Sequence, residues 1–467
     1  MDTRTLTLVD GSHIVVPDSL TLITPFVLAE QQDWFEDEIR FLRHLLQPGE
    51  QVLDIGANHG VYTLSMANTV GQHGHIWAFE PASSTAELLQ RSLALNPLGN
   101  VTLIRCALSA QTGEAQLSLH EQSELNTLTP HSQADGHYET VPVSTLDAQL
   151  TLHAWHDIAF VKMDAEGEEE NILRGAAQFF ASQSPLIMYE IKTADQVNHA
   201  LIQAFEDRGY RSYQLVPDLN ALVPLDRERE PDSYALNLFC CKDDRAAMLA
   251  QRGVLLTADM LRQGTLVDHT PAAQYHWQHA WAGLPYGTVL RRFWDEQTAN
   301  GLDPDMARAL LHYAVSRDPA QPLLQRFLAL RDSQQRLHAA CARHAGFMRL
   351  ASLARVEQGL GNRSAAVEAL MQLSELLLQQ HTALNLDEPF LPPSIRFDTL
   401  SPHGDIVRWA YAAVLETLEH LWAYSAFYTG VSTLERLHLI RDLGFASDMM
   451  QRRLTLIEKR MAGDTRL

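Results

Sequence analysis

The chain has 467 residues, of which 46% are hydrophobic and 20% charged, a normal composition for a globular protein of two or three domains. Its net charge of −21 argues against a nucleic-acid groove and against docking on an anionic membrane, since both need clustered Lys and Arg. The four cysteines fit neither a disulfide framework nor a zinc site, and we find neither a signal pattern nor an apolar run long enough to cross a bilayer. We therefore expect a cytoplasmic protein that is not inserted in a membrane.

The first 50 residues are expected to form an N-terminal hairpin and an entry helix. Thr5–Val16 alternates apolar and polar residues around a central Asp-Gly pair, a strong hairpin signal. Asp33–Leu46 carries apolar residues at helical spacing and is followed by a Pro-Gly pair that favours the end of a helix.

Residues 51–244 alternate apolar strand candidates with helical segments. This pattern predicts an α/β domain with a doubly wound, Rossmann-like, mainly parallel sheet covered on both faces. Only a loop separates the last two strand candidates, so an antiparallel edge is expected to close the sheet. Two shorter β segments, Glu114–His120 and Val141–Leu146, precede the fourth main strand. The main strand candidates are Gln51–Gly56, His75–Pro81, Val101–Ser109, Ile158–Asp164, Pro185–Ile191, Tyr210–Val216 and Leu236–Lys242.

The first strand and turn have the pattern of a nucleoside-binding site. The strand ends at Asp54, a turn with Gly56 and Gly60 follows, and the next strand ends at Glu80. Such glycines let the turn approach a ligand, and an acid after the second strand accepts hydrogen bonds from a ribose. Asn58 stands where a dinucleotide fingerprint needs its second glycine, and a carboxylate at the turn repels pyrophosphate but suits an ammonium group. We therefore expect S-adenosylmethionine (SAM) rather than a nicotinamide cofactor; the alternative is a generic strand-to-helix turn.

Further cofactor contacts are expected at two places. Pro81 directly follows Glu80 and is assigned to the same site. Ala107, Leu108 and Ser109 end the third strand, where an adenine ring would lie. An ordinary buried strand end is an equally open interpretation of these three residues.

Four segments together resemble the FkbM-type SAM-dependent methyltransferases: VLDIGANHGVYTLSMA, AFEP, VPVSTLD and FVKMDAEGEEENILRGA. The resemblance covers about residues 30–242. It implies methyl transfer from SAM, most often to a hydroxyl of a sugar or a polyketide-like acceptor. We therefore expect O-methylation of a carbohydrate or glycoconjugate, with a small-molecule or glycan acceptor as the partner. A methyltransferase-like domain without turnover, serving as a binding or scaffold module, stays open as the alternative.

Three acids follow the fourth and fifth strands, where ligands of such sheets bind: Asp164, Glu166 and Glu190. A carboxylate whose pKa is raised by its neighbours can take the proton of a methyl acceptor. Clustered acids can instead hold a divalent cation, which is the less favoured version. Glu166 can also simply favour the N-terminus of the next helix. His59, within the glycine turn, is either a base or a packed turn residue.

Residues 245–467 lack strand patterns, and Leu, Ala, Gln, Arg and His dominate, which predicts an all-helical domain. One helix is expected to open at Asp303-Pro304, an N-cap residue followed by proline. Residues 349–378 resemble a single tetratricopeptide-like hairpin, although an ordinary helical hairpin is favoured. We expect this half to fold separately, without chemistry of its own, and to serve acceptor recognition or homo-oligomerisation.

Overall fold

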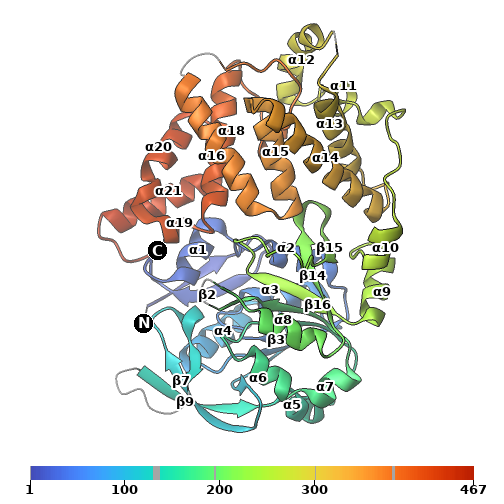
Figure 1. Cartoon of the computed structure of the whole chain (residues 1–467). Helices are drawn as coiled ribbons and strands as arrows, with labels where there is room; N and C mark the ends of the chain where they lie inside the picture. Colours follow the sequence, from blue (N-terminus) through green and yellow to red (C-terminus); the bar gives the residue numbers. More distant parts are fainter. Residues whose placement is uncertain (1, 130–136, 194–195, 300, 381–383) are drawn as a thin grey trace.

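The computed structural model describes residues 2–129, 137–193, 196–299, 301–380 and 384–467. An α/β half carries the first part of the chain, and helices of the second part are stacked on it (Figure 1). None of the helices within the described ranges is both long and apolar enough to span a membrane.

An eight-stranded sheet forms the centre of the α/β half, in the order β15-β14-β16-β11-β10-β3-β4-β5. Its inner strands run parallel, and β16 joins β11 antiparallel, so the expected Rossmann-like sheet with an antiparallel edge is confirmed. The edge strand β15 was missed, because it lies inside the segment predicted to be a loop. The strands are β3 (Gln51–Ile55), β4 (His75–Phe79), β5 (Val101–Ile104), β10 (Ile158–Met163), β11 (Leu186–Glu190), β14 (Arg211–Val216), β15 (Ala221–Pro224) and β16 (Asn237–Cys241).

Both faces of this sheet are covered by helices, which explains why its strands are almost uniformly apolar. Successive residues point to opposite faces: Val52 belongs to one hydrophobic core and Leu53 to the other, and Phe160 and Val161 divide in the same way. The helices of this half are α1 (Ile23–Gln31), α2 (Asp37–Leu45), α3 (Val61–Val70), α4 (Ser83–Leu95), α5 (Leu146–His153), α6 (Glu169–Arg174), α7 (Ala177–Ser182), α8 (His199–Glu206) and α9 (Asp243–Gln251).

Smaller β elements surround the main sheet. The expected N-terminal hairpin is present as an antiparallel pair of strands. The expected third strand, Val101–Ser109, is split: its second part leaves the main sheet as β6 and pairs with β9 in a four-stranded sheet. The elements are β1 (Thr3–Thr7), β2 (His13–Pro17), β6 (Ala107–Leu108), β7 (Gly113–Leu119), the 3₁₀ turn η1 (Ser123–Leu125), β8 (Thr127–Thr129), β9 (His137–Ser144), β12 (Lys192–Thr193) and β13 (Gln196–Val197).

The second half of the chain is all-helical within its described residues, as expected. Asp303 caps α13 by accepting hydrogen bonds from the backbone of Asp305 and Met306, with Pro304 in the first turn. The hairpin expected at 349–378 is formed by α15 and α16. The helices are α10 (Ala258–Gln263), α11 (Trp277–Ala280), α12 (Pro285–Gln297), α13 (Pro304–Arg317), α14 (Leu323–Arg343), α15 (Phe347–Leu360), α16 (Arg363–Gln380), α17 (Arg396–Thr399), α18 (Ile406–Trp422), α19 (Ala426–Thr429), α20 (Leu434–Asp442) and α21 (Asp448–Met461).

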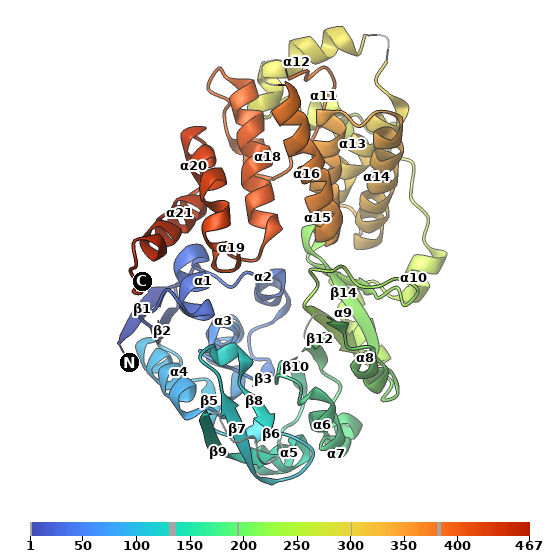
Figure 2. The same cartoon turned by 60° about the vertical axis from the view of Figure 1, so that its left-hand side comes forward.

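The hydrophobic cores do not divide at residue 245. That residue lies inside α9, whose Ala246 and Leu249 pack in a core of the α/β half. The same core takes in Ile457 and Leu467 from the C-terminus. Conversely, the β14–β15 edge reaches into the core of the helical half. The two termini lie on the same side of the molecule in both views, the C-terminus beside α1 and the N-terminus below it, near β2 (Figures 1 and 2).

Candidate functional site

The glycine turn after β3 is pressed against the end of β10. Gly56 has a φ of 76°, and a Cβ there would lie only 1.7 Å from the carbonyl oxygen of Asp164. Gly60, with a φ of 90°, leaves room for Leu89, whose Cδ1 would be 2.3 Å from a Cβ. Both positions therefore require glycine, for conformation and for space. The close approach also brings the expected cofactor turn directly beside the first of the three expected acids.

Glu80 lies under the turn as a buried carboxylate. Its two oxygens accept hydrogen bonds from the backbone nitrogens of Asn58 and Ala82, each at 2.9 Å. Burial raises the pKa of Glu80 to about 7. A carboxylate has about four acceptor sites, so these two bonds leave capacity for ligand hydroxyls.

Asp54 lies deeper than its place in the motif suggests, with no exposed surface. One of its oxygens accepts a hydrogen bond from the Thr63 hydroxyl, and the other lies 3.9 Å from the Lys162 ammonium. Burial raises the pKa of this carboxyl. Asp54 thus fixes the turn from below, where it faces Lys162.

The other expected cofactor residues sit around this turn with mixed exposure. Pro81 is partly exposed, whereas Ala107 and Leu108 are buried in the small sheet. The Ser109 hydroxyl donates to Glu168 at 2.7 Å. Ser109 is therefore already engaged by a side chain at the start of α6.

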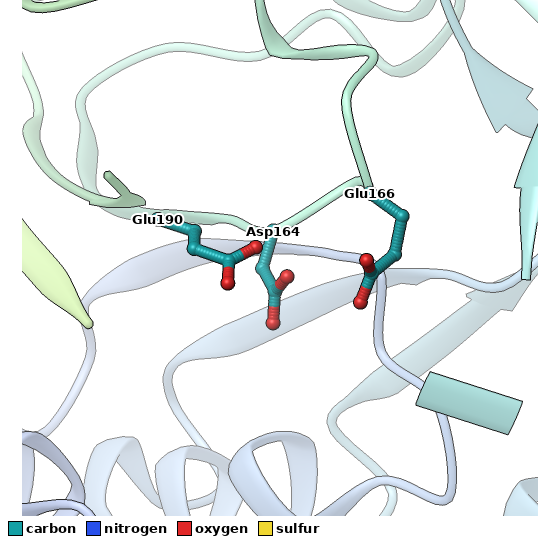
Figure 3. A group of neighbouring side chains, drawn as sticks. All are labelled: Asp164, Glu166 and Glu190. Carbon is teal, nitrogen blue, oxygen red and sulfur yellow. The ribbon is translucent and has the colours of Figure 1, made fainter. Parts of the chain in front are cut away.

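The structure brings Asp164, Glu166 and Glu190 together. A carboxylate oxygen from each lies within 4.8 Å of the other two, and the three side chains point to the same side of the sheet edge (Figure 3). Burial, with the charge of Asp164 next, raises the pKa of Glu166 to about 8 and that of Glu190 to about 9. The group can hold a proton near neutral pH, and its hard oxygen ligands also suit a divalent cation.

Lys162 links the acids to the cofactor turn. Its buried ammonium donates to Asp164 at 3.0 Å and to the carbonyl oxygen of Gly56 at 3.2 Å, and it lies over the Tyr62 ring. Burial opposes the charged form, but Asp164 and Asp54 hold the pKa of Lys162 above its ordinary value. Lys162 therefore bridges Asp164 and the backbone of the glycine turn.

A fourth acid, Glu36, reaches the group from the start of α2 and was missed in the sequence. It accepts hydrogen bonds from the Tyr62 hydroxyl and from the Asn237 amide, the latter at 3.2 Å. Burial raises the pKa of Glu36, which is also one of the charges that raise the pKa of Glu190. No local pattern could reveal this contact, because its partners lie far apart along the chain.

His59 is buried, and burial lowers its pKa to about 4. The imidazole is therefore neutral near pH 7, and its Nδ1 makes no hydrogen bond with the described residues. A group with so low a pKa is a weak proton acceptor.

A cavity of about 820 Å³ opens between the two halves of the molecule. Glu36 and Asn237 line it on the α/β side, so it adjoins the acids. Residues of α14, of the α15–α16 junction and of the end of α18 line it on the helical side. Its volume lies in the range of cavities that hold sizeable ligands.

Residues 54–212 match the family model described as "Methyltransferase FkbM domain". This part of the chain is an FkbM-type methyltransferase domain. The resemblance seen in the motifs is thereby confirmed, and with it SAM-dependent methyl transfer as the class of activity. The C-terminal half of the chain has no family match. No curated protein matches the chain significantly.

Solved structures of several methyltransferases are similar to part of this chain. A putative rRNA methylase from Clostridium thermocellum is 11% identical, with a TM-score of 0.28, over 45% of this chain and 94% of its own. Fibrillarin from Aeropyrum pernix, solved with bound SAM, is 14% identical, with a TM-score of 0.27, over 51% and 93%. A SAM-dependent O-methyltransferase from Thermotoga maritima is 13% identical, with a TM-score of 0.26, over 51% and 77%. With TM-scores this low, no conclusion about the present chain rests on them.

Proposed function

We propose that this protein transfers the methyl group of SAM to a hydroxyl of a carbohydrate or glycoconjugate. The observation that carries the proposal is the contact between two parts of an FkbM-type domain. The glycine turn of β3 touches Asp164, and Asp164 belongs to a group of carboxylates at the ends of β10 and β11. A methyl donor held by the turn would therefore lie beside groups that can receive a proton.

The donor is held, in this proposal, by the turn around Gly56 and Asn58 and by Glu80. The free acceptor capacity of Glu80 suits the two ribose hydroxyls of SAM. Pro81 and the segment Ala107–Ser109 would flank the adenine. Asp54 acts from beneath the turn and balances Lys162, rather than meeting the ligand directly.

Methyl transfer is an in-line displacement in which the acceptor oxygen bonds to the methyl carbon while the carbon–sulfur bond breaks. The sulfonium becomes a neutral thioether, and the proton of the hydroxyl must leave. Glu190 is the proposed proton acceptor, with Asp164 orienting the hydroxyl, because a carboxylate with a raised pKa binds a proton more strongly than an ordinary one. His59 has no part in this step, since its pKa of about 4 makes it a weak base.

A second version gives the acids a divalent cation that acidifies the acceptor hydroxyl. The mutual closeness of Asp164, Glu166 and Glu190 favours it. Activity that is lost with a chelator and restored by Mg²⁺ or Mn²⁺ would establish this version. Activity that is unchanged by a chelator would favour the first version, in which Glu190 accepts the proton without a metal ion.

The acceptor can be identified by mass spectrometry of glycans from a deletion strain. Loss of one CH₂ unit from a glycan, restored by the wild-type gene but not by a Glu190→Gln variant, is the expected result. An unchanged glycan profile, together with no turnover of bound SAM, would support the alternative of a non-catalytic binding module.

A further inference from the structure

The cavity between the two halves has walls of different charge. On the α/β side acids outnumber bases: the two arginines there, Arg40 and Arg229, are each paired with an acid, whereas Glu36 has no basic partner within 4 Å among the described residues. The acids of this wall are Glu36, Asp37, Glu38, Asp226, Glu230 and Asp232. On the helical side the cavity is lined by Arg331 of α14 and Arg363 of α16. Neither arginine has a carboxylate within 4 Å among the described residues, although the chain has 57 acids and only 36 Lys and Arg.

Arg363 is held in a fixed position. Its guanidinium lies 4.8 Å from the ring centre of Tyr234 and 4.6 Å from that of Tyr424. Its Nε donates to the carbonyl oxygen of Leu421 at 2.9 Å, and one Nη2 hydrogen is directed to the end of α18. A guanidinium has five N–H donors, so most of the terminal donors remain free. A charged group fixed in this way loses little conformational entropy when it binds a ligand.

The acids whose charges act on Arg363, and the acid of the helical wall, are engaged elsewhere. Asp37 forms an ion pair with Arg40. Asp232 accepts hydrogen bonds from the backbone and the hydroxyl of Ser364, at the start of α16. Glu357 accepts from the Gln334 and Asn362 amides and contacts His338 at 2.6 Å. The positive charge of Arg363 is therefore left without a direct counter-ion, and burial lowers its pKa without making it neutral near pH 7.

A chain of contacts through two aromatic rings and Glu36 connects this arginine to the acid group. The ring of Tyr424 is 4.9 Å from that of Phe35, which directly precedes Glu36. Glu36 in turn accepts a hydrogen bond from Tyr62, the Tyr62 ring lies under Lys162, and Lys162 donates to Asp164. One extended ligand can thus lie along aromatic rings, with hydroxyls at the carboxylates and an anionic group at the arginines.

We propose that the helical half recognises the methyl acceptor through an anionic group, a carboxylate or a phosphate, that pairs with Arg363 and Arg331. The inference rests on the proposed function for the hydroxyl end of the acceptor and deepens it by naming the charge of the other end. Charge-assisted bonds from arginine forks are the usual means of recognising such groups. The helices would then select the acceptor while the α/β half performs the transfer.

The test uses the full-length protein saturated with S-adenosylhomocysteine, and three probes: D-glucuronate, D-glucose 6-phosphate and D-glucose. Calorimetric or NMR titration is expected to show binding of at least one anionic sugar, with glucose at least about tenfold weaker, as expected for a hydrogen bond to a charged group. Preference for glucuronate or for the phosphate identifies which anion the site takes.

The variants are Arg363→Gln and Arg331→Gln, with Arg308→Gln as the matched control. Arg331 is exposed and, among the described residues, makes only a ring contact with Phe327, so its replacement should leave the fold intact. Arg308 is an exposed arginine of α13 that does not line the cavity. Both cavity variants should weaken the anionic sugar about tenfold or more, and the control should not.

Equal binding of glucose and the anionic sugars, no binding of either anion, or unchanged affinity in both cavity variants would overturn the inference. Binding of S-adenosylhomocysteine is measured on the same samples. If the wild-type protein does not bind S-adenosylhomocysteine, the proposed function is rejected. A failure of the proposed function can therefore be told apart from a failure of the inference about the anionic group.

Discussion

At the scale of single residues, Glu166 and Glu190 lower the stability of the fold while they provide the groups proposed for the reaction. Burial and mutual repulsion raise the pKa of Glu190 to about 9 and that of Glu166 to about 8, against an ordinary value of 4.5. Between pH 4.5 and 9 the folded state therefore binds more protons than the unfolded state. It follows that the contribution of these groups to stability falls as pH rises through this window. Strained groups of this kind are typical of functional sites.

Replacing Glu190 with Gln should therefore change activity and stability in opposite directions. The amide cannot accept the proton, so methyl transfer should fall about a hundredfold, the usual scale of acid–base catalysis. The amide is neutral in both the folded and the unfolded state, so folding at pH 8 no longer requires the uptake of a proton, and the melting temperature at pH 8 should rise. Wild-type turnover at saturating SAM should increase from pH 7 towards 9, as Glu190 ionises, and this increase should be absent in the variant.

Asp164→Asn serves as a comparison. This substitution leaves Lys162 without its closest carboxylate, so it should lower the melting temperature and also reduce the rate of methyl transfer. SAM affinity, measured by titration, should be nearly unchanged in the Glu190 variant. Full activity in both amide variants would remove the acids from the reaction.

Glu80 gives a separate prediction for the donor. Glu80→Gln removes the charged acceptor for the ribose, so SAM affinity should fall about ten- to a hundredfold. Wild-type affinity should also weaken as pH falls below about 7, where this carboxylate becomes protonated. Calorimetric titration between pH 6 and 8 should show that SAM affinity depends on pH in the wild type and does not in the variant. Equal affinities would exclude Glu80 from the site.

The residues at strand ends could be predicted from the sequence, because the carboxyl ends of neighbouring parallel strands meet at one edge of the sheet. Asp164, Glu166 and Glu190 come together for this reason. Glu36 and Arg363 could not be predicted, since each reaches the site from a distant helix. The depth of Asp54 was also hidden, because a motif gives the order of residues and not their burial.

At the scale of elements, the turn after β3 is the most constrained piece of backbone in the site. Gly56 is needed both for its φ of 76° and for its contact with β10. Gly56→Ala should add about 1–3 kcal/mol of backbone strain and also displace the end of β10. SAM binding should be lost, because the turn and the acids are shifted together.

Gly209→Ala is the matched control for this effect. Gly209 has a φ of 80° but no atom within 4 Å of an added Cβ. The Gly209→Ala variant should therefore lose stability through backbone strain alone and should still bind SAM. Chemical denaturation and SAM titration of both variants separate strain from the contact with Asp164.

The main strands and the antiparallel edge of the sheet were predicted from the sequence, but β15 was not. Its four residues, Ala221–Pro224, end in proline and are followed by a highly charged segment, so their local pattern indicates a loop. The strand forms because both of its faces find partners: Leu222 packs in a core of the α/β half, and Ala221 and Val223 pack in the helical core. Tertiary contacts here override local preference.

At the scale of the whole molecule, the two halves are interlocked more than the change in composition at residue 245 indicates. Arg453 of α21 is fully buried between Glu30 of α1 and Glu419 of α18, at 2.8 and 2.9 Å. The C-terminal helix thus joins the first helix of the chain to the helical half. The sequence predicts an α/β half and a helical half, but the pairing of residues more than 400 positions apart leaves no local signal.

This interlocking predicts that the full-length protein unfolds as one unit. Scanning calorimetry should show a single transition, and S-adenosylhomocysteine should shift all of it upward, because a ligand of the native state stabilises whatever unfolds with its site. Arg453→Leu leaves the buried carboxylate of Glu30 without its basic partner and Glu419 with Arg436 alone, and should destabilise that one transition by about 3–5 kcal/mol. Arg466→Ala, which removes an exposed pair with Asp2, should cost at most about 1 kcal/mol. If the helical half folded separately, two transitions would appear, and the ligand would shift only one of them.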